Sequence, residues 1–188
     1  MNIAVYLGAS FGNNKKFQDE CVKLGNYIGK SNHTLIYGGS KSGLMGLIAD
    51  SVLEEGGKVI GIEPKMFIDR ALQHPLISEL IITDNLAERR QKMLELGDCY
   101  IAFPGGTGTL DEITEVMEMI SLSEFDSKYK NKKCIFYNLD GYYNEIKSLL
   151  DKMILNDFTN NRRLKNVYFA NDLKELDIII NSWYIKSC

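Results

Sequence analysis

Short apolar runs alternate with helix-patterned segments along almost the whole chain. The expected strands cover residues 3–7, 34–37, 59–62, 80–83, 99–103, 134–137 and 167–169. The expected helices cover 15–30, 44–53, 86–96, 110–122, 142–155 and a terminal segment from residue 172, while 65–78 is ambiguous and has room for a short helix. Strands that alternate with helices over short connections run parallel. The pattern therefore predicts an α/β fold with a doubly wound, mainly parallel sheet of the Rossmann-like type, in a single domain over residues 1–188.

Two details of these elements can be predicted from single residues. Pro64 is expected to end the third strand, because proline lacks the N–H that a strand ladder uses. Leu86, Met93 and Leu94 are expected to form the apolar side of the helix over 86–96.

Length and charge exclude several classes of protein. The 188 residues suit one domain, and 22 basic against 25 acidic residues give a net charge of -3. This balance argues against nucleic acid as a partner, since binding a phosphate backbone needs a basic face. The N-terminus lacks the pattern of a signal peptide, and no apolar run is long enough to cross a membrane, so we expect no membrane association.

Cysteine and histidine usage limits the chemistry further. Cys21, Cys99, Cys134 and Cys188 are scattered without a CxxC motif, which favours free thiols in a cytoplasmic protein over a disulfide framework or a zinc site. Only two histidines occur, so a multi-histidine metal centre is excluded and no metal is expected. His74, which precedes a proline, is expected to be structural.

The first of two glycine-rich loops follows the second expected strand. It runs over residues 37–46 and contains Gly38, Gly39 and Gly43. It is neither a P-loop nor a GxGxxG dinucleotide fingerprint. Backbone N–H groups at the start of the next helix could bind an anion there, and we expect this role. The alternative is a tightly packed crossover in which glycine is needed for steric reasons.

The second loop follows the fifth expected strand and is richer in glycine. Its candidate phosphate-binding residues are Gly105, Gly106, Thr107, Gly108 and Thr109. Removing Cβ atoms from a loop at a strand end lets a phosphate approach the backbone N–H groups, and Thr109 is placed to cap the following helix or to donate its hydroxyl.

Charged residues follow two of the strands. Asp111 and Glu112 are expected in the first turn of the helix after the second loop, and Glu112 lies beside its buried stripe. A carboxylate there is a candidate for chemistry on a sugar, although acidic residues also suit a helix N-terminus. Arg89, after the fourth strand, could reach a phosphate or ribose as a planar fork, although most charges on that helix are explained by solvation.

Together these residues resemble the LOG family, the cytokinin riboside 5′-monophosphate phosphoribohydrolases, many of which were earlier named lysine decarboxylases. The family's PGGxGTxxE signature matches residues 104–112, and further similarity lies at residues 8–10, 37–46, 74–76 and 138–143. The resemblance implies hydrolysis of the N-glycosidic bond of a nucleoside 5′-monophosphate, without a cofactor, in a homodimer. It also implies that Arg89 and Glu112 are catalytic, that the glycine loop binds phosphate and ribose, and that Arg90 takes the place of the family lysine.

The chain departs from the family at several positions. Leu86 and Ala87 replace a Met-His pair, Thr107 replaces an aromatic residue, and Ala71 stands about where plant members carry a substrate-contacting glutamate. The preferred base therefore stays open, and AMP is as good a candidate substrate as a cytokinin nucleotide. The main alternative function is a non-enzymatic carrier of a nucleotide or of the molybdenum cofactor on the same fold, which would not need Glu112 or Arg89.

Overall fold

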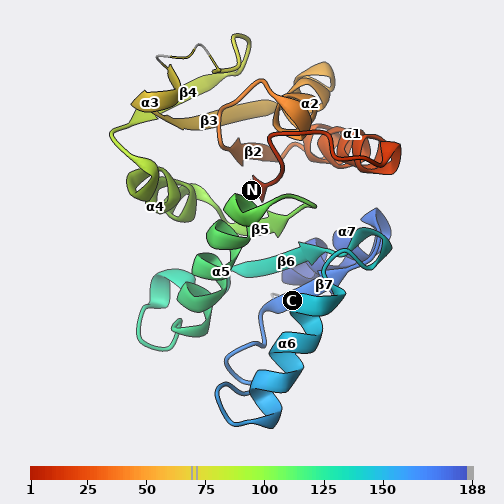
Figure 1. The fold of residues 1–188 in the computed structure, drawn as a ribbon, viewed down its shortest axis with the longest axis vertical. Coiled ribbons are helices and arrows are strands. Elements are labelled where there is room, and N and C mark those ends of the chain that lie inside the picture. The colour runs from red at the N-terminus through yellow and green to blue at the C-terminus, as the bar shows by residue number, and fades with distance from the viewer. Residues whose placement is uncertain (69, 71, 186–188) are drawn as a thin grey trace.

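One sheet of seven strands forms the centre of the molecule (Figure 1). The computed structural model describes residues 1–68, 70 and 72–185, the last three without their side chains. Within this part the strand order is β4-β3-β2-β1-β5-β6-β7, and every neighbouring pair is parallel. The strands are β1 Asn2–Tyr6, β2 Thr34–Tyr37, β3 Lys58–Pro64, β4 Glu79–Thr83, β5 Cys99–Ala102, β6 Lys133–Tyr137 and β7 Val167–Ala170. The predicted single-domain, doubly wound α/β fold is confirmed.

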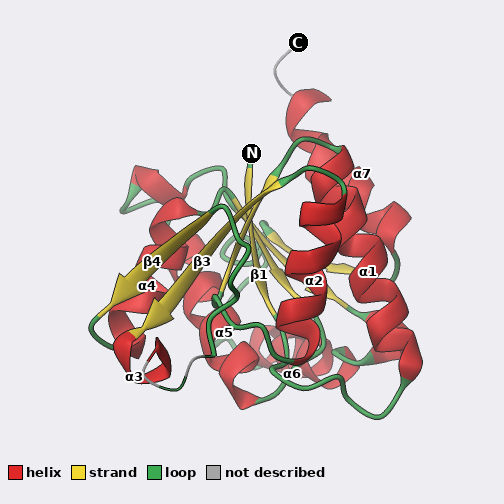
Figure 2. Cartoon of the chain, turned by 90° about the horizontal axis from the view of Figure 1, so that it is seen from above, coloured by secondary structure: helices red, strands yellow, loops and turns green. Residues whose placement is uncertain are grey.

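Helices cover both faces of the sheet (Figure 2). Their bounds are α1 Lys15–Lys30, α2 Gly43–Glu54, α3 Lys65–Ile68, α4 Leu86–Leu96, α5 Thr107–Ser121, α6 Asn144–Leu155 and α7 Leu173–Ile185. Helices α1, α2 and α7 pack on one face, and α4 and α5 pack on the other. No described helix is long and apolar enough to span a membrane.

Strand β1 shows why the strands read as continuous apolar runs. Ile3 and Val5 point into the core beneath α1 and α2, while Ala4 and Tyr6 point into the core beneath α4 and α5. All four residues are at most 2% exposed. A parallel strand that is buried on both faces has no need for polar residues at alternate positions.

The topology fixes where a ligand can bind. From β1 the chain builds the sheet outward to β4 and then returns to place β5 on the other side of β1. Tyr6 and Ala102 are paired in register at the carboxyl ends of these two strands. The loops after β1 and β5 therefore leave the sheet side by side, at the topological switch point where α/β proteins bind ligands.

Pro64 ends β3 as predicted, although the strand, Lys58–Pro64, is longer than the predicted 59–62; proline is tolerated at a strand end because its missing N–H costs the ladder little there. Two predicted helix boundaries were wrong. Helix α6 begins at Asn144 instead of residue 142, because Asp140 and Gly141 adopt left-handed conformations with φ of 52° and 77°. Helix α5 begins at Thr107 instead of residue 110, as described below.

Some predictions concern buried or undescribed residues. Cys21, Cys99 and Cys134 are free and buried, and burial raises the pKa of Cys21 and of Cys99 to about 12. These thiols are therefore protonated at neutral pH. Ala71, Cys188 and the side chain of Trp183, for which a packing role is predicted, lie outside the described residues.

Candidate active site

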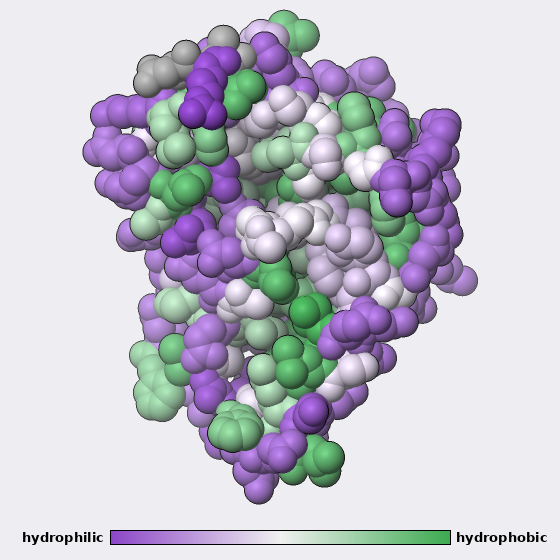
Figure 3. Space-filling model, in the orientation of Figure 1, coloured by the Kyte–Doolittle hydropathy of each residue, from purple (hydrophilic) through white to green (hydrophobic). Residues whose placement is uncertain are grey.

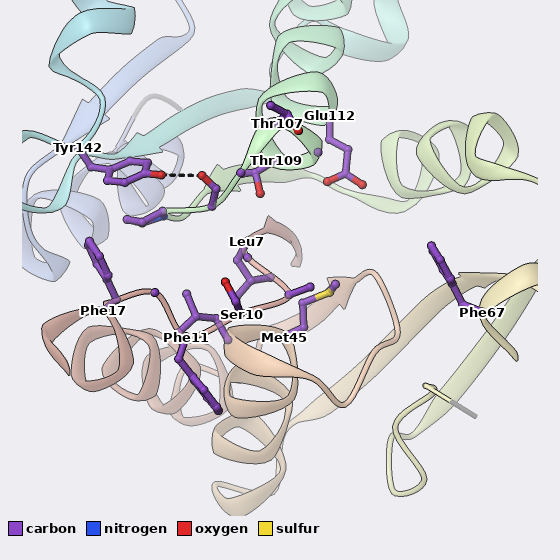
Figure 4. Close-up of a pocket in the computed structure, with 18 of the residues that line it drawn as sticks. Leu7, Ser10, Phe11, Phe17, Met45, Phe67, Thr107, Thr109, Glu112 and Tyr142 are labelled. Carbon is purple, nitrogen blue, oxygen red and sulfur yellow. Dashed lines mark hydrogen bonds between the residues drawn. The ribbon is translucent and has the colours of Figure 1, made fainter. Parts of the chain in front are cut away.

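A pocket of about 720 Å³ opens at the switch point between β1 and β5 (Figure 4). One wall consists of the glycine loop after β5 and the start of α5, and the other consists of the segment after β1 and the start of α2. The residues that line it are Leu7–Gly12, Phe17, Leu44, Met45, Phe67, Leu86, Arg89, Pro104–Thr109, Glu112 and Tyr142. In the space-filling view, weakly polar and apolar residues occupy the centre of the molecule's face and strongly hydrophilic residues much of its left and right sides (Figure 3).

The start of α5 is suited to bind an anion. The helix begins within the glycine loop, with Gly106 as its N-cap and no side chain bonded to the N-terminal N–H groups. The first intrahelical bond at this end runs from the N–H of Leu110 to the carbonyl oxygen of Gly106, at 3.2 Å. The N–H groups before Leu110 and the positive end of the helix dipole therefore meet the pocket without an internal partner.

This early start corrects two expectations. Thr109 lies inside the first turn of α5 and does not cap it, and Asp111 and Glu112 fall in the second turn. Glycine has a low helix propensity, which favours a helix start after the loop. Gly108 is nevertheless part of the first turn of α5. Glu112 thereby lies one turn above the anion-binding end, within the same pocket.

Close contacts hold the glycine loop in shape. A Cβ on Gly105 would lie 2.2 Å from Thr109 Oγ1 and 3.0 Å from the N of Gly8, so only glycine fits. The Thr109 side chain is thus folded against the loop, and the residue is 4% exposed. The Tyr142 hydroxyl donates a hydrogen bond of 2.6 Å to the carbonyl oxygen of Gly105, as Figure 4 shows.

Arg89 and Glu112 form an ion pair at the pocket wall. The Arg89 guanidinium donates through Nη2 to Glu112 Oε1, and the side chains are only 13% and 10% exposed. Asn85 sets the position of Arg89, because its side chain accepts from the N–H of Glu88 at 2.9 Å and fixes the start of α4. The two residues to which the resemblance assigns catalysis are therefore in direct contact.

The environment of Glu112 is unusual for a carboxylate. Burial raises the pKa of Glu112 above its ordinary value, and the Arg89 charge and hydrogen bond offset part of this effect. When it is ionised, a buried carboxylate beside a guanidinium carries its negative charge with little hydration. Such a group interacts strongly with positive charge that develops nearby.

The first glycine loop contributes to the site in a different way from that expected. Of this loop Leu44 and Met45 line the pocket, whereas Gly38, Gly39 and Gly43 do not. A Cβ on Gly43 would lie 2.4 Å from the carbonyl carbon of Ala9, and Gly43 has a φ of 57°. These contacts favour the alternative interpretation, in which the glycines let two loops cross closely.

Arg90 points away from the cavity. Its side chain forms ion pairs with Glu115 at 2.9 Å and Asp111 at 3.2 Å, and it is not among the lining residues. Leu86, expected on the buried side of α4, is 38% exposed and lines the pocket. It is the first residue of α4, whose buried residues, Met93 and Leu94, lie in the later turns.

Several lining residues were not singled out as site residues. The segment from Gly8 to Gly12 follows β1, and its position after a strand is the same signal that identified the glycine loop. Phe67 belongs to the ambiguous segment after Pro64, and no motif marks it. His74 is buried outside the pocket lining, and its Nε2 lies 3.0 Å from Asp50 Oδ1. Among the described residues no group of three or more acidic, cysteine or histidine side chains could hold a metal ion.

Comparison with known proteins identifies relatives of this chain. A family model described as "Possible lysine decarboxylase" matches residues 45–178. The cytokinin riboside 5′-monophosphate phosphoribohydrolase LOG3 of Arabidopsis thaliana is 36% identical over 174 residues, which cover 93% of this chain and 79% of that protein. The corresponding enzyme of Rhodococcoides fascians is 33% identical over 175 residues, covering 92% of this chain and 85% of that protein.

Solved structures show the same fold in more distant proteins. The Moco carrier protein of Chlamydomonas reinhardtii superposes with a TM-score of 0.70 at 17% identity and covers 98% of both chains. The molybdenum cofactor binding protein of Rippkaea orientalis gives 0.68 at 18% identity, over 97% of this chain and 96% of that one. The family model and the sequence relatives show that this chain belongs to the LOG family, described as possible lysine decarboxylases.

Proposed function

We propose that this protein hydrolyses the N-glycosidic bond of a nucleoside 5′-monophosphate to a free base and ribose 5-phosphate. The observation that carries the proposal is the shared pocket of the Arg89–Glu112 pair and the uncapped N-terminus of α5. The Glu112 carboxylate of the pair suits a sugar that develops positive charge, and the helix N-terminus suits a phosphate. The activity named for the plant and bacterial relatives supports the same reaction.

The 5′-phosphate binds at the N-terminus of α5 in this proposal. Thr107, Gly108 and Thr109 present their N–H groups there, and neither Gly106 nor Gly108 has another atom within 4 Å of a Cβ built on it. The resulting open space lets an anion approach the backbone. Binding energy from the phosphate then fixes the ribose for attack.

The reacting bond lies next to Glu112. As the C1′–N bond breaks, its electron pair leaves with the base and positive charge develops on the ribose ring. The Glu112 carboxylate stabilises this charge and accepts a proton from the water whose oxygen attacks C1′; the departing base nitrogen takes up one proton, delivered from Glu112 directly or through solvent, which restores the carboxylate. Arg89 keeps Glu112 ionised and oriented, because a guanidinium beside a carboxylate favours its charged form.

The base lies beyond Glu112. In Figure 4, Tyr142, Thr109, Glu112 and Phe67 follow one another along the pocket. A phosphate at Thr109 and a ribose at Glu112 leave the end toward Phe67 for the base, and Met45 and Leu86 are further apolar residues of the lining. These apolar side chains provide a surface for a purine, and they favour AMP and N⁶-alkylated derivatives such as cytokinin nucleotides over polar substitutions.

The direct test is release of free base by the purified protein. Incubation with AMP, other nucleoside monophosphates and isopentenyladenosine monophosphate, followed by chromatography, is expected to give free base from at least one purine monophosphate. Glu112→Gln is expected to remove most of this release. Tight binding of a nucleotide or of the molybdenum cofactor, without hydrolysis of any nucleotide tested, would contradict the enzyme proposal and support the carrier function.

We also propose that the protein is a homodimer. Support comes from the side of the sheet closed by the edge strand β4, where Met66, Leu76, Ile82 and Leu86 are between 38% and 73% exposed. Apolar side chains near a strand edge are commonly covered by a second chain. Light scattering is expected to give twice the chain mass of 21.3 kDa, and a value near 21.3 kDa would refute the dimer.

A further inference from the structure

A second buried carboxylate lies behind the ion pair. Glu63 is near the end of β3, is 1% exposed and does not line the pocket. Its Oε2 is buried and has no hydrogen-bond partner among the described residues. A buried, unpartnered carboxylate oxygen is unfavourable for folding, so its presence requires a reason.

The side chain of Arg89 has the complementary property. Its Nη2 donates to Glu112, whereas its Nε is buried without a partner in the described part of the chain. Two buried atoms of opposite hydrogen-bonding type, one on a carboxylate and one on a guanidinium, are thus left unused in the same region. Charges in such a setting attract each other more strongly than they do in water.

Contacts with one loop bring Glu63 and Arg89 together. A Cβ on Gly38 would lie 3.3 Å from Arg89 Nη1, and a Cβ on Gly39 would lie 3.0 Å from the Cβ of Glu63. The two side chains therefore pack against successive residues that follow β2. The pKa of Glu63 reflects this proximity, since burial raises it and the Arg89 charge lowers it in part.

We propose that Glu63 is a positioning residue that shares the Arg89 guanidinium with Glu112. Among the described residues Glu63 forms no hydrogen bond or ion pair with Arg89, so the proposed sharing acts through charge at short range, and the five N–H donors of the guanidinium leave capacity for a second carboxylate when Arg89 shifts. When the ribose engages Glu112, Glu63 keeps Arg89 in place. The inference rests on the proposed hydrolysis, and it adds a residue that acts through Arg89 without touching the substrate.

The sharing predicts a pH effect that a merely structural residue would not produce. An ionised Glu63 draws the guanidinium charge away from Glu112 and repels that carboxylate, so its removal should lower the pKa of Glu112. The ionisable groups that face the two carboxylates are Tyr6 from β1, Tyr37 from β2, Arg89 and Arg90 from α4, and Asp111 from α5. All of these groups are unchanged in a Glu63 variant.

The experiment compares the wild type with Glu63→Gln and Glu63→Asp. Glutamine keeps the volume and removes the charge, while aspartate keeps the charge. In Glu63→Gln, kcat for base release should fall about tenfold, as for the loss of one charge–charge interaction with Arg89, and the acid limb of the kcat/KM profile should move to lower pH. Glu63→Asp should retain the wild-type limb. The matched control is Glu79→Gln on β4, a half-exposed carboxylate paired with Lys58, which should change neither property.

A second readout separates this inference from the proposed reaction. Carbon-13 NMR of the Glu112 carboxyl, assigned with Glu112→Gln, reports its titration in the absence of any substrate. A shift of that titration to lower pH in Glu63→Gln supports the sharing even if no nucleotide is hydrolysed. An unchanged Glu112 titration, with or without a loss of thermal stability, overturns it.

Discussion

Arg89 and Glu112 form a nearly buried ion pair between α4 and α5, two helices that follow different strands of the sheet. Neither partner is stable alone in this position, because a buried charge without a counter-charge is strongly unfavourable. The pair therefore fixes the relative placement of the two helices where they border the pocket. It also sets the Glu112 carboxylate about one helical turn from the uncapped N-terminus of α5.

Loss of either charge should abolish most of the activity. Glu112→Gln and Arg89→Ala are each expected to lower kcat/KM for base release by about 10²-fold or more, the usual effect of removing an acid–base group. The assay is chromatographic detection of base from AMP. Glu115→Gln, in the next turn of α5 and outside the pocket lining, is the control and should retain nearly full activity. Equal losses in Glu115→Gln and Glu112→Gln would contradict the assignment.

Activity should be lost on acidification at a higher pH than for a carboxylate with an ordinary pKa. Burial raises the pKa of Glu112 above its ordinary 4.5, and the carboxylate must be ionised to work. Activity should thus be lost as pH falls through this raised pKa, and a kcat/KM profile in AMP measures it. The same shift means that the folded state holds the proton more tightly than the unfolded chain does, so this group contributes stability below its unfolded pKa and loses that contribution as pH rises. An acid limb at or below 4.5 would disagree.

Two glycines of the second loop should respond differently to alanine. Gly105→Ala places a methyl group against Thr109 and Gly8 and should lower Tm by about 3 °C or more. Gly108→Ala meets open space within a helix, so Tm should be unchanged or higher, while KM for AMP rises because the methyl group intrudes on the bound phosphate. Thermal melts and steady-state kinetics of both variants provide the test. A normal KM in Gly108→Ala would place the phosphate elsewhere.

The first glycine loop should affect stability more than binding. Gly43→Ala combines a φ of 57° with a contact of 2.4 Å to the Ala9 backbone and should cost about 3 kcal/mol or more in unfolding free energy. Gly56→Ala, with a φ of 73° and nothing within 4 Å, isolates the conformational effect at about 1 kcal/mol. Denaturant unfolding measures both. If Gly43→Ala keeps its stability and instead raises KM, this loop binds the anion.

The sequence predicted the sheet because buried parallel strands and amphipathic helices have distinct periods. Ile3 and Ala4 are both apolar because both faces of β1 are covered. The position of the pocket followed from the same pattern, since loops after parallel strands meet at one edge. Glu112 and Arg89 were identified by the family resemblance and by their positions after strands, and the structure brings them into contact.

Other features depend on tertiary contacts that no local pattern contains. Arg90 was expected to bind the substrate, but two carboxylates one turn apart on α5 hold it away from the pocket. The first glycine loop resembles an anion loop, and only the approach of the Ala9 backbone shows its packing role. Glu63 stands about where a dinucleotide fingerprint would place its acidic residue, but without that fingerprint the sequence assigned it no role, and its burial and nearness to Arg89 are visible only in the fold.

The measurement that tests the proposed function most directly is base release from AMP compared with adenosine under identical conditions. The two substrates share base and sugar and differ only in the group that α5 is proposed to bind. We expect adenine and ribose 5-phosphate from AMP, and a rate from adenosine lower by about 10²-fold or more, since the phosphate supplies the binding energy that fixes the ribose. Equal rates from both substrates, or no adenine from any purine monophosphate, would contradict the proposal.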